Sequence, residues 1–201
     1  MKKLLFLLLL LISLLSCQPK AQLPELGKVS AFSLTKENGQ PFSSEELKGQ
    51  VWIADFIFTT CPKECPLMTQ EMAKIQDKIK TIAGIKLISF TVDPEHDTPD
   101  ILTKYGQSFG AQSDKWRFLT GSRDDLYNLC QNDFHLPVLK VGEKDNHHDH
   151  HSKEATDSSP FLHSQKFVLV DGNLMIRGYY ESSNPEELKK LEKDWQILIA
   201  S

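Results

Sequence analysis

The sequence has no apolar run long enough to cross a lipid bilayer as a helix. The run from Leu4 to Leu15 has twelve residues, whereas a membrane-spanning helix needs about 20. An excess of positive charge is also missing, because 23 Lys and Arg residues stand against 27 Asp and Glu residues, for a net charge of −4. Nucleic-acid-binding proteins usually carry a basic patch. The composition therefore gives no indication of a nucleic-acid partner, and the chain shows neither an internal repeat nor a second domain.

The short apolar run has the features of an export signal. It follows Met1-Lys2-Lys3, and a charged start before a short apolar core is typical of secretory signals. The segment Leu14 to Cys17 then resembles a bacterial lipoprotein cleavage site, with Cys17 as the lipidated first residue of the mature protein. We expect residues 1–16 to be removed, residues 17–30 to form a tether, and the domain to be lipid-anchored to a bacterial membrane outside the cytoplasm. The alternative is an ordinary signal cleaved nearby.

Cysteine is scarce, at four residues in 201. If Cys17 is lipidated, three cysteines remain, and an odd number in an exported chain indicates one pair and one further thiol. Cys130 lies on the apolar face of a predicted helix, where a buried and inert thiol is the expected state.

Cys61 and Cys65 lie between an apolar run, Val51 to Phe58, and a helical pattern. A strand, a cysteine turn and a helix in this order are typical of thioredoxin-like proteins. Pro66 suits the first position of a helix, so we expect Cys65 to be the N-cap and Cys61 to lie in the preceding turn. The positive end of the helix dipole would lower both thiol pKa values. Thiolates attack disulfides and bind soft metals, so the site should be redox-active, metal-binding or both.

Asp55 interrupts the apolar run six residues before Cys61. A buried carboxylate needs a reason, because burying a charge is costly. Thioredoxins have a buried aspartate at this offset that serves in proton transfer, so Asp55 could relay protons for the thiols. A structural, hydrogen-bonded carboxylate is an equal alternative. His96, further along, is interpreted as an exposed loop residue.

The order of the predicted elements is that of a thioredoxin-like α/β fold, with a central mixed sheet flanked by helices. We expect one domain over residues 31–201, with an added N-terminal hairpin and a polar loop insertion at 141–159. Strands are expected at residues 31–34, 51–58, 85–92, 116–119, 165–170 and 174–180. Longer helices are expected from Pro66, from Pro99, over residues 126–134 and from Pro185.

The loop insertion contains a histidine tract, made of His147, His148, His150 and His151. Tracts of this composition are interpreted as metal-binding. The alternative is a solvated loop with incidental affinity, because flexible ligands must be ordered when they bind.

Four places together resemble the Sco/SenC family of copper proteins, which help to assemble cytochrome c oxidase. They are Phe58 to Pro66, Val92 to Pro94 with Asp97 to Pro99, Trp116 to Gly121, and His163-Ser164. The resemblance implies that Cys61, Cys65 and His163 bind copper, and two sulfurs with one imidazole suit Cu(I) or Cu(II). The family often has an aspartate immediately before the histidine, where this sequence has Leu162.

The resemblance implies a membrane-anchored copper chaperone rather than an enzyme. Its target would be cytochrome c oxidase subunit II or another copper-site apoprotein, and its other partner a copper donor or a thiol reductant. The alternative is a thiol-disulfide oxidoreductase that keeps the cysteines of a partner's metal site reduced. Asp55 favours this alternative. Against it, thioredoxin oxidoreductases have a cis-proline where this chain has His163-Ser164. A peroxidase, which this fold also hosts, has no other support.

Overall fold

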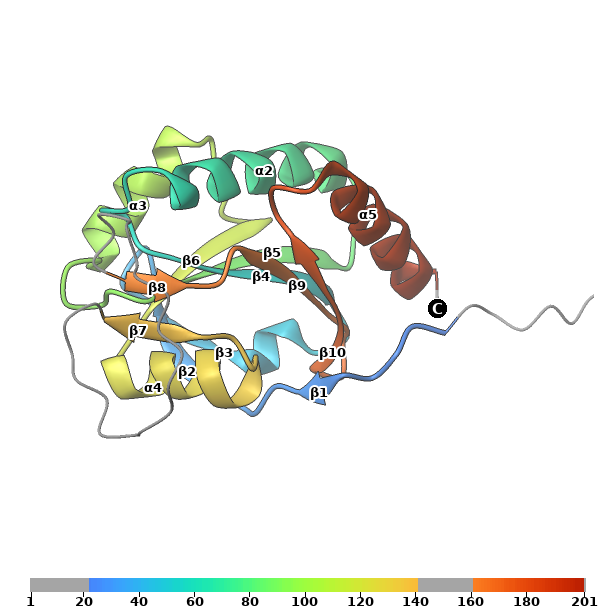
Figure 1. Ribbon diagram of the computed structural model, residues 1–201, viewed down its shortest axis with the longest axis horizontal. Coiled ribbons are helices and arrows are strands. Elements are labelled where there is room, and N and C mark those ends of the chain that lie inside the picture. Colours follow the sequence, from blue (N-terminus) through green and yellow to red (C-terminus); the bar gives the residue numbers. More distant parts are fainter. Residues whose placement is uncertain (1–21, 141–160, 201) are drawn as a thin grey trace, which may run out of the picture.

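The computed structural model describes the backbone of residues 22–140 and 161–200, and the side chains of all of these except residues 139, 140 and 161–163. Within these residues the strands form two sheets. The larger sheet has eight strands in the order β1-β10-β9-β4-β5-β6-β2-β3, and the smaller pairs β7 with β8 (Figure 1). The mixed α/β sheet predicted from the sequence is therefore confirmed.

The strands are β1 (Gly27–Lys28), β2 (Ser33–Lys36), β3 (Pro41–Ser43), β4 (Val51–Ile57), β5 (Ile85–Thr91), β6 (Trp116–Thr120), β7 (Val138–Lys140), β8 (Phe161–His163), β9 (Lys166–Val170) and β10 (Met175–Glu181). The helices are η1 (Ser44–Leu47, 3₁₀), α2 (Glu64–Ile79), α3 (Pro99–Ser108), α4 (Arg123–Asn128), η2 (Leu129–Asp133, π) and α5 (Pro185–Ile199).

The strand β4 lies inside the large sheet and leads into the cysteine turn. It runs parallel to β5 and antiparallel to β9. In Figure 1, α2 and α5 lie on one side of the sheet, whereas η1 and α4 lie on the other. A strand covered on both faces is expected to be almost continuously apolar, and all seven residues of β4 are buried.

Aromatic side chains pack β4 against its neighbours near the end that leads into the cysteine turn. The ring centroids of Phe56 and Phe90 are 5.0 Å apart, and that of Phe134 is 5.2 Å from Phe56. Trp52 continues the contact, with its centroid 5.9 Å from that of Phe134. Burying a phenylalanine side chain contributes about 2 kcal/mol. The cluster therefore gives the end of β4 a rigid support.

Both predicted hairpins are present. β2 pairs with β3 across a turn in which Gly39 has a φ of 80°, and β9 pairs with β10. Part of the segment predicted as a tether, residues 17–30, belongs to the folded domain instead, because Leu26 and Val29 donate backbone hydrogen bonds to β10 and the β9–β10 turn and β1 extends the sheet. Such long-range pairing leaves no local periodicity, so the sequence pattern missed it.

The helix predicted over residues 126–134 has a different form. Ser122 caps α4 by accepting the backbone N–H of Asp125 at 3.1 Å. The helix then widens into the π-turn η2, which ends at Asp133. Its predicted apolar face is buried as expected, through Leu126, Leu129 and Cys130.

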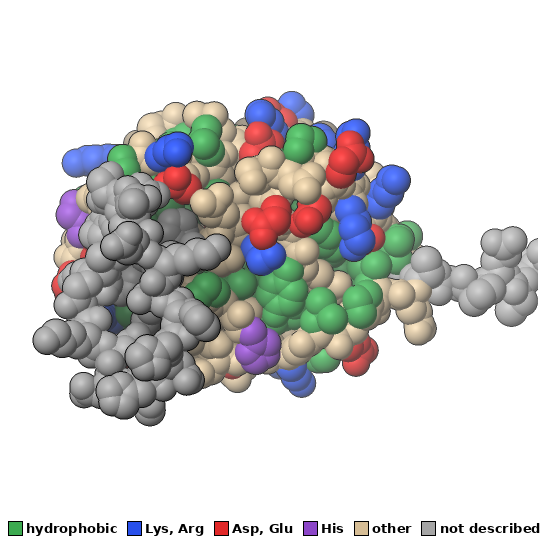
Figure 2. Space-filling view, in the orientation of Figure 1, with side chains coloured by type: hydrophobic (Ala, Val, Ile, Leu, Met, Phe, Trp, Pro, Cys, Tyr) green, Lys and Arg blue, Asp and Glu red, His purple; other side chains and the backbone are tan. Residues whose placement is uncertain are grey.

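The surface shown in Figure 2 carries acidic and basic side chains side by side. Ion pairs join neighbouring elements, as between Lys78 of α2 and Glu192 of α5, and between Lys166 of β9 and Glu181 of β10. Exposed pairs of this kind contribute little to stability, about 0 to 1 kcal/mol each. Within residues 22–140 and 161–200, no helix is both long and apolar enough to span a membrane.

Candidate metal centre

The cysteine pair lies where β4 ends and α2 begins, as the sequence predicted. The Cys61 N–H donates to the Phe58 carbonyl at 3.2 Å, which closes the turn. The predicted helix start was wrong, because α2 begins at Glu64 with Lys63 as its N-cap. Cys65 is thus the second helical residue and Pro66 the third. A proline fits there because the first four N–H groups of a helix have no partner within it, and Glu64 suits the positive end of the dipole.

The two cysteines are buried, and a backbone N–H group donates a hydrogen bond to each sulfur. Cys61 is 4% exposed and Cys65 is fully buried. The Cys65 N–H donates to Cys61 Sγ at 3.3 Å, and the Phe58 N–H donates to Cys65 Sγ at 3.5 Å. Cys61 Sγ also lies 3.8 Å from Glu64 Oε2. Both residues are thiols, with no disulfide between them. The two thiols are joined by a hydrogen bond, so the structure brings them together.

Cys65 has a strongly perturbed thiol. The hydrogen bond between the thiols raises the pKa of Cys65 far above its usual value, and burial and the nearby charge of Asp55 raise it further. The prediction that the helix dipole lowers the Cys65 pKa is therefore wrong. The hydrogen bond that the thiol donates and its burial favour the protonated form more than the helix dipole favours the thiolate. Cys61 Sγ accepts the hydrogen bond that the Cys65 thiol donates.

Asp55 lies beneath the pair, fully buried on β4 opposite Ser89 of β5. Its charge raises the pKa of Cys65 and also that of Tyr105, where burial is the largest cause. The Tyr105 hydroxyl lies 2.9 Å from Thr69 Oγ1, and Thr69 donates to the Cys65 carbonyl at 2.7 Å. Asp55 is thus electrostatically linked to the thiols, while its role in proton transfer stays a prediction.

The backbone of His163 is brought toward the cysteine end of the sheet. β9 runs antiparallel to β4, with Val168 opposite Ala54, so the chain before β9 extends toward the end of β4 from which the cysteine turn leaves. His163 closes β8 and pairs with Val138 of β7. Its side chain is outside the described part, as are Cys17 and the tract His147, His148, His150 and His151. Among the described side chains, no three His, Cys, Asp or Glu residues form a metal cluster.

Cys130 lies apart from the pair, as predicted. It is fully buried in η2, and its thiol lies 3.7 Å from the Leu136 carbonyl oxygen. Burial raises the pKa of Cys130 to about 12. A thiol in this state is a core side chain rather than a nucleophile.

Sequence reasoning missed the contacts of Asp97, which tie the cysteine turn to the loop after β5. Asp97 is fully buried. Its carboxylate accepts the Thr59 N–H at 3.1 Å, the Thr59 hydroxyl at 2.5 Å and the Thr91 hydroxyl at 2.6 Å. The only sequence signal was the motif Asp97-Thr98-Pro99, which does not show what the aspartate touches.

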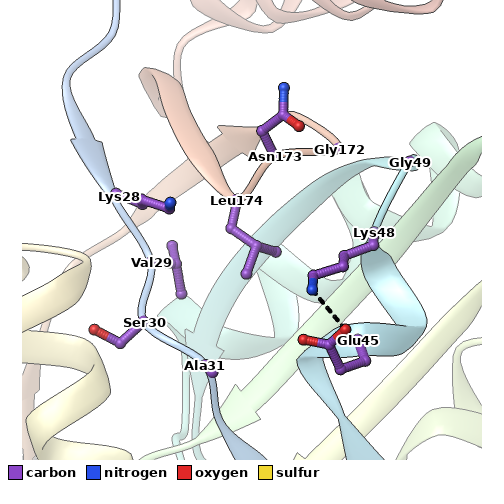
Figure 3. A pocket seen from close by; sticks show the side chains of 10 residues that line it. All are labelled: Lys28, Val29, Ser30, Ala31, Glu45, Lys48, Gly49, Gly172, Asn173 and Leu174. Atoms are coloured by element: carbon purple, nitrogen blue, oxygen red, sulfur yellow. Dashed lines mark ion pairs between the residues drawn. The ribbon is translucent and has the colours of Figure 1, made fainter.

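The hollow drawn in Figure 3 belongs to the other end of the sheet. Lys28, Lys48 and Leu174 are among the residues that line it, and Lys48 pairs with Glu45 at 2.6 Å. Gly49, also in its lining, precedes β4, whereas the cysteines follow the opposite end of that strand. The hollow is therefore separate from the cysteine pair.

Comparison with known proteins gives the family. Residues 20–195 match the family model described as SCO1/SenC. The chain belongs to the SCO1/SenC family. A curated relative from Bacillus subtilis, named SCO1 protein homolog, is 37% identical over 152 residues, which are 74% of this chain and 72% of the relative.

Solved structures of SCO1/SenC proteins share the fold. A SCO1/SenC family lipoprotein from Bacillus anthracis is 31% identical, with a TM-score of 0.75 over 89% of this chain and 99% of that one. BsSco, described as having a disulfide switch and as a member of the Sco family of cytochrome c oxidase assembly proteins, is 30% identical, with a TM-score of 0.70 over 89% and 98%. Copper-bound ScoI of Bradyrhizobium japonicum is 22% identical, with a TM-score of 0.64 over 83% and 98%. The predicted thioredoxin-like fold is confirmed.

Proposed function

We propose that this SCO1/SenC protein is a membrane-anchored copper chaperone for the dinuclear copper site of cytochrome c oxidase. The observation that carries the proposal is the pair of nearly buried thiols, Cys61 and Cys65, joined by hydrogen bonds at the end of β4. Soft thiolates select Cu(I). Family membership supports copper as the cargo, because the related ScoI holds copper and the related BsSco is described as an assembly protein.

His163 is proposed as the third ligand. Its backbone place at the end of β8, before β9, is consistent with an imidazole directed to the cysteine end of the sheet. Two sulfurs and one nitrogen satisfy Cu(I), whereas Zn²⁺ usually takes a fourth ligand. Such a site would leave room for an apoprotein such as subunit II to supply a further ligand and take the ion. One tightly bound Cu(I) per chain, measured by competition titration of the reduced protein, tests the proposal.

The lipid anchor at Cys17 is the second part of the proposal. The Bacillus anthracis relative is a lipoprotein, and the sequence before the domain has the form of a lipoprotein signal. Anchoring would hold the domain on the outer side of a bacterial membrane, near a membrane-bound oxidase. Metabolic labelling with a radioactive fatty acid tests it, since the label should be lost in Cys17→Ala.

Thiol-disulfide exchange is the second candidate function. The observation that favours it is the hydrogen-bonded pair, in which Cys65 donates to the Cys61 sulfur and has a raised pKa. Thioredoxin-type exchange needs one attacking thiolate and one resolving thiol. The disulfide switch described for BsSco supports this reading. Both functions require the same reduced pair.

The burial and the raised pKa of Cys65 predict the order of alkylation. Treating the reduced protein with iodoacetamide at pH 8 should modify Cys61 roughly ten times faster than Cys65, because Cys65 is fully buried and its raised pKa lowers its thiolate fraction. Cys130 should react only after urea unfolds the core, because it is buried and its pKa is about 12. Peptide mass spectrometry at short times gives the order. First labelling at Cys65 would contradict the raised pKa and the burial of this thiol.

A further inference from the structure

A histidine and a buried carboxylate, His96 and Asp97, lie beside the cysteine turn and form what we call its rim. His96 and Asp97 lie in the loop after β5, and β5 runs parallel to β4 with Thr91 opposite Ile57. Parallel strands end at the same edge of a sheet, so this loop and the cysteine turn are neighbours. The His96 side chain is 48% exposed, whereas that of Asp97 is fully buried. The His96 imidazole therefore faces solvent, and the Asp97 carboxylate fixes it to the core.

The hydrogen bonds determine which imidazole nitrogen is available. His96 Nδ1 lies 3.0 Å from Asp97 Oδ1. An ionised carboxylate only accepts hydrogen bonds, so we assign the proton to Nδ1. Nε2 of the neutral ring then keeps its lone pair. Histidines that bind metals commonly have this arrangement, with a carboxylate on the other ring nitrogen.

The same carboxylate positions the ring relative to the cysteines. Asp97 is held by two hydrogen bonds from Thr59 and one from Thr91. His96 Nδ1 also lies 3.4 Å from Thr59 Oγ1. Thr59 precedes Cys61 by two residues, so their Cα atoms are at most about 7 Å apart. His96 therefore stands beside the turn that carries the first sulfur.

We propose that Nε2 of His96 binds copper transiently as the ion enters or leaves the cysteine pair. The inference rests on the copper function proposed above. Cys61 is only 4% exposed and Cys65 is fully buried, so an incoming ion meets the rim before it reaches both sulfurs. A Cu–Nε2 bond forms first and breaks as the two Cu–Sγ bonds form. Copper stays Cu(I), no electron moves, and the thiol protons pass to the buffer.

His135 provides a matched control. It is also an exposed histidine, but it lies in a hollow with Leu26 and Tyr179, beside Gly27 of β1. The sheet order places β1 three strands from β4, a separation of about 14 Å at the usual strand spacing. Asparagine tolerates the φ of 51° found at His135, so His135→Asn should keep the backbone.

The test is the rate at which the reduced full chain, in detergent, takes Cu(I) from its bicinchoninate complex. All variants carry asparagine at the four tract histidines, so that the tract cannot bind the ion. Stopped-flow absorbance should show that His96→Gln slows uptake roughly tenfold, while its equilibrium Cu(I) affinity stays within about threefold of the parent. His135→Asn should leave rate and affinity unchanged.

A second measurement traps the ion at the rim. In Cys61→Ser/Cys65→Ser, substoichiometric Cu(I) should shift the ¹⁵N NMR signal of His96 Nε2, and the His135 signals should not move. An unshifted His96 signal would contradict the proposed contact.

The outcomes separate the two proposals. If the parent protein binds no Cu(I), the chaperone function and the rim ligand both fail. If the parent binds Cu(I) and His96→Gln takes it up at the parent rate, only the rim ligand fails. Equal slowing by His135→Asn, or a tenfold loss of equilibrium affinity in His96→Gln, would also overturn a transient role at His96.

Discussion

Cys65→Ser is expected to lower the Cu(I) affinity of the reduced protein by roughly a thousandfold, which corresponds to about 4 kcal/mol of binding free energy. Cys61→Ser should have an effect of similar size. The proposed site has two sulfurs, and a serine hydroxyl is a poor replacement because Cu(I) prefers soft ligands. Competition with a chromophoric Cu(I) chelator under anaerobic conditions measures the change.

Cys130→Ser is the matched control for these variants. Cys130 is a thiol of the same core, but it lies in η2 with its sulfur near the Leu136 carbonyl. Its replacement should leave both the stoichiometry and the affinity for Cu(I) unchanged. A comparable loss of affinity in Cys130→Ser would show that a ligand has been misplaced, and full affinity in Cys61→Ser or Cys65→Ser would remove the proposed site.

Asp97→Asn should lower the free energy of unfolding by about 2 to 4 kcal/mol, which is large for one side chain. The Asp97 carboxylate accepts hydrogen bonds from Thr59 and Thr91 on both of its oxygens. An asparagine keeps only one acceptor oxygen, and its NH₂ group would face a donor. Buried donors would then lose their acceptor, which carries a high cost.

Urea unfolding monitored by tryptophan fluorescence measures this loss, and hydrogen exchange at the Thr59 amide reports on the turn itself. The Thr59 amide should exchange faster in Asp97→Asn than in the parent. Asp100→Asn is the control, since Asp100 is exposed in the first turn of α3 and should change stability by no more than about 0.5 kcal/mol. Equal stability of Asp97→Asn and Asp100→Asn would show that the buried contacts of Asp97 contribute little.

The parts of the fold that the sequence predicted well depend on local patterns. The apolar run of β4 and the hairpin around Gly172 were recognisable because burial on both faces and turn formation leave direct marks in the residues. The start of α5 was equally clear. Asn184 accepts the backbone N–H groups of Glu186 and Glu187, and Pro185 takes the first helical position.

The features that the sequence did not reveal depend on distant contacts. Asp97 meets Thr59 across 38 positions, and β1 meets β10 across most of the chain. The pKa of Cys65 is raised, whereas the helix dipole alone predicts that it is lowered. This pKa depends mainly on the hydrogen bond to Cys61, on burial and on the charge of Asp55. The spacing of residues in the sequence does not give the size of these effects.

The most direct test of the central claim is a Cu(I) competition titration of reduced residues 22–201, with the four tract histidines replaced, with and without His163→Ala. We predict one tightly bound ion per chain, and a loss of affinity of roughly a hundredfold when the His163 imidazole is removed. Weak binding that does not depend on His163 would contradict a preformed two-sulfur, one-nitrogen site. It would leave the pair of Cys61 and Cys65 as a dithiol reductant.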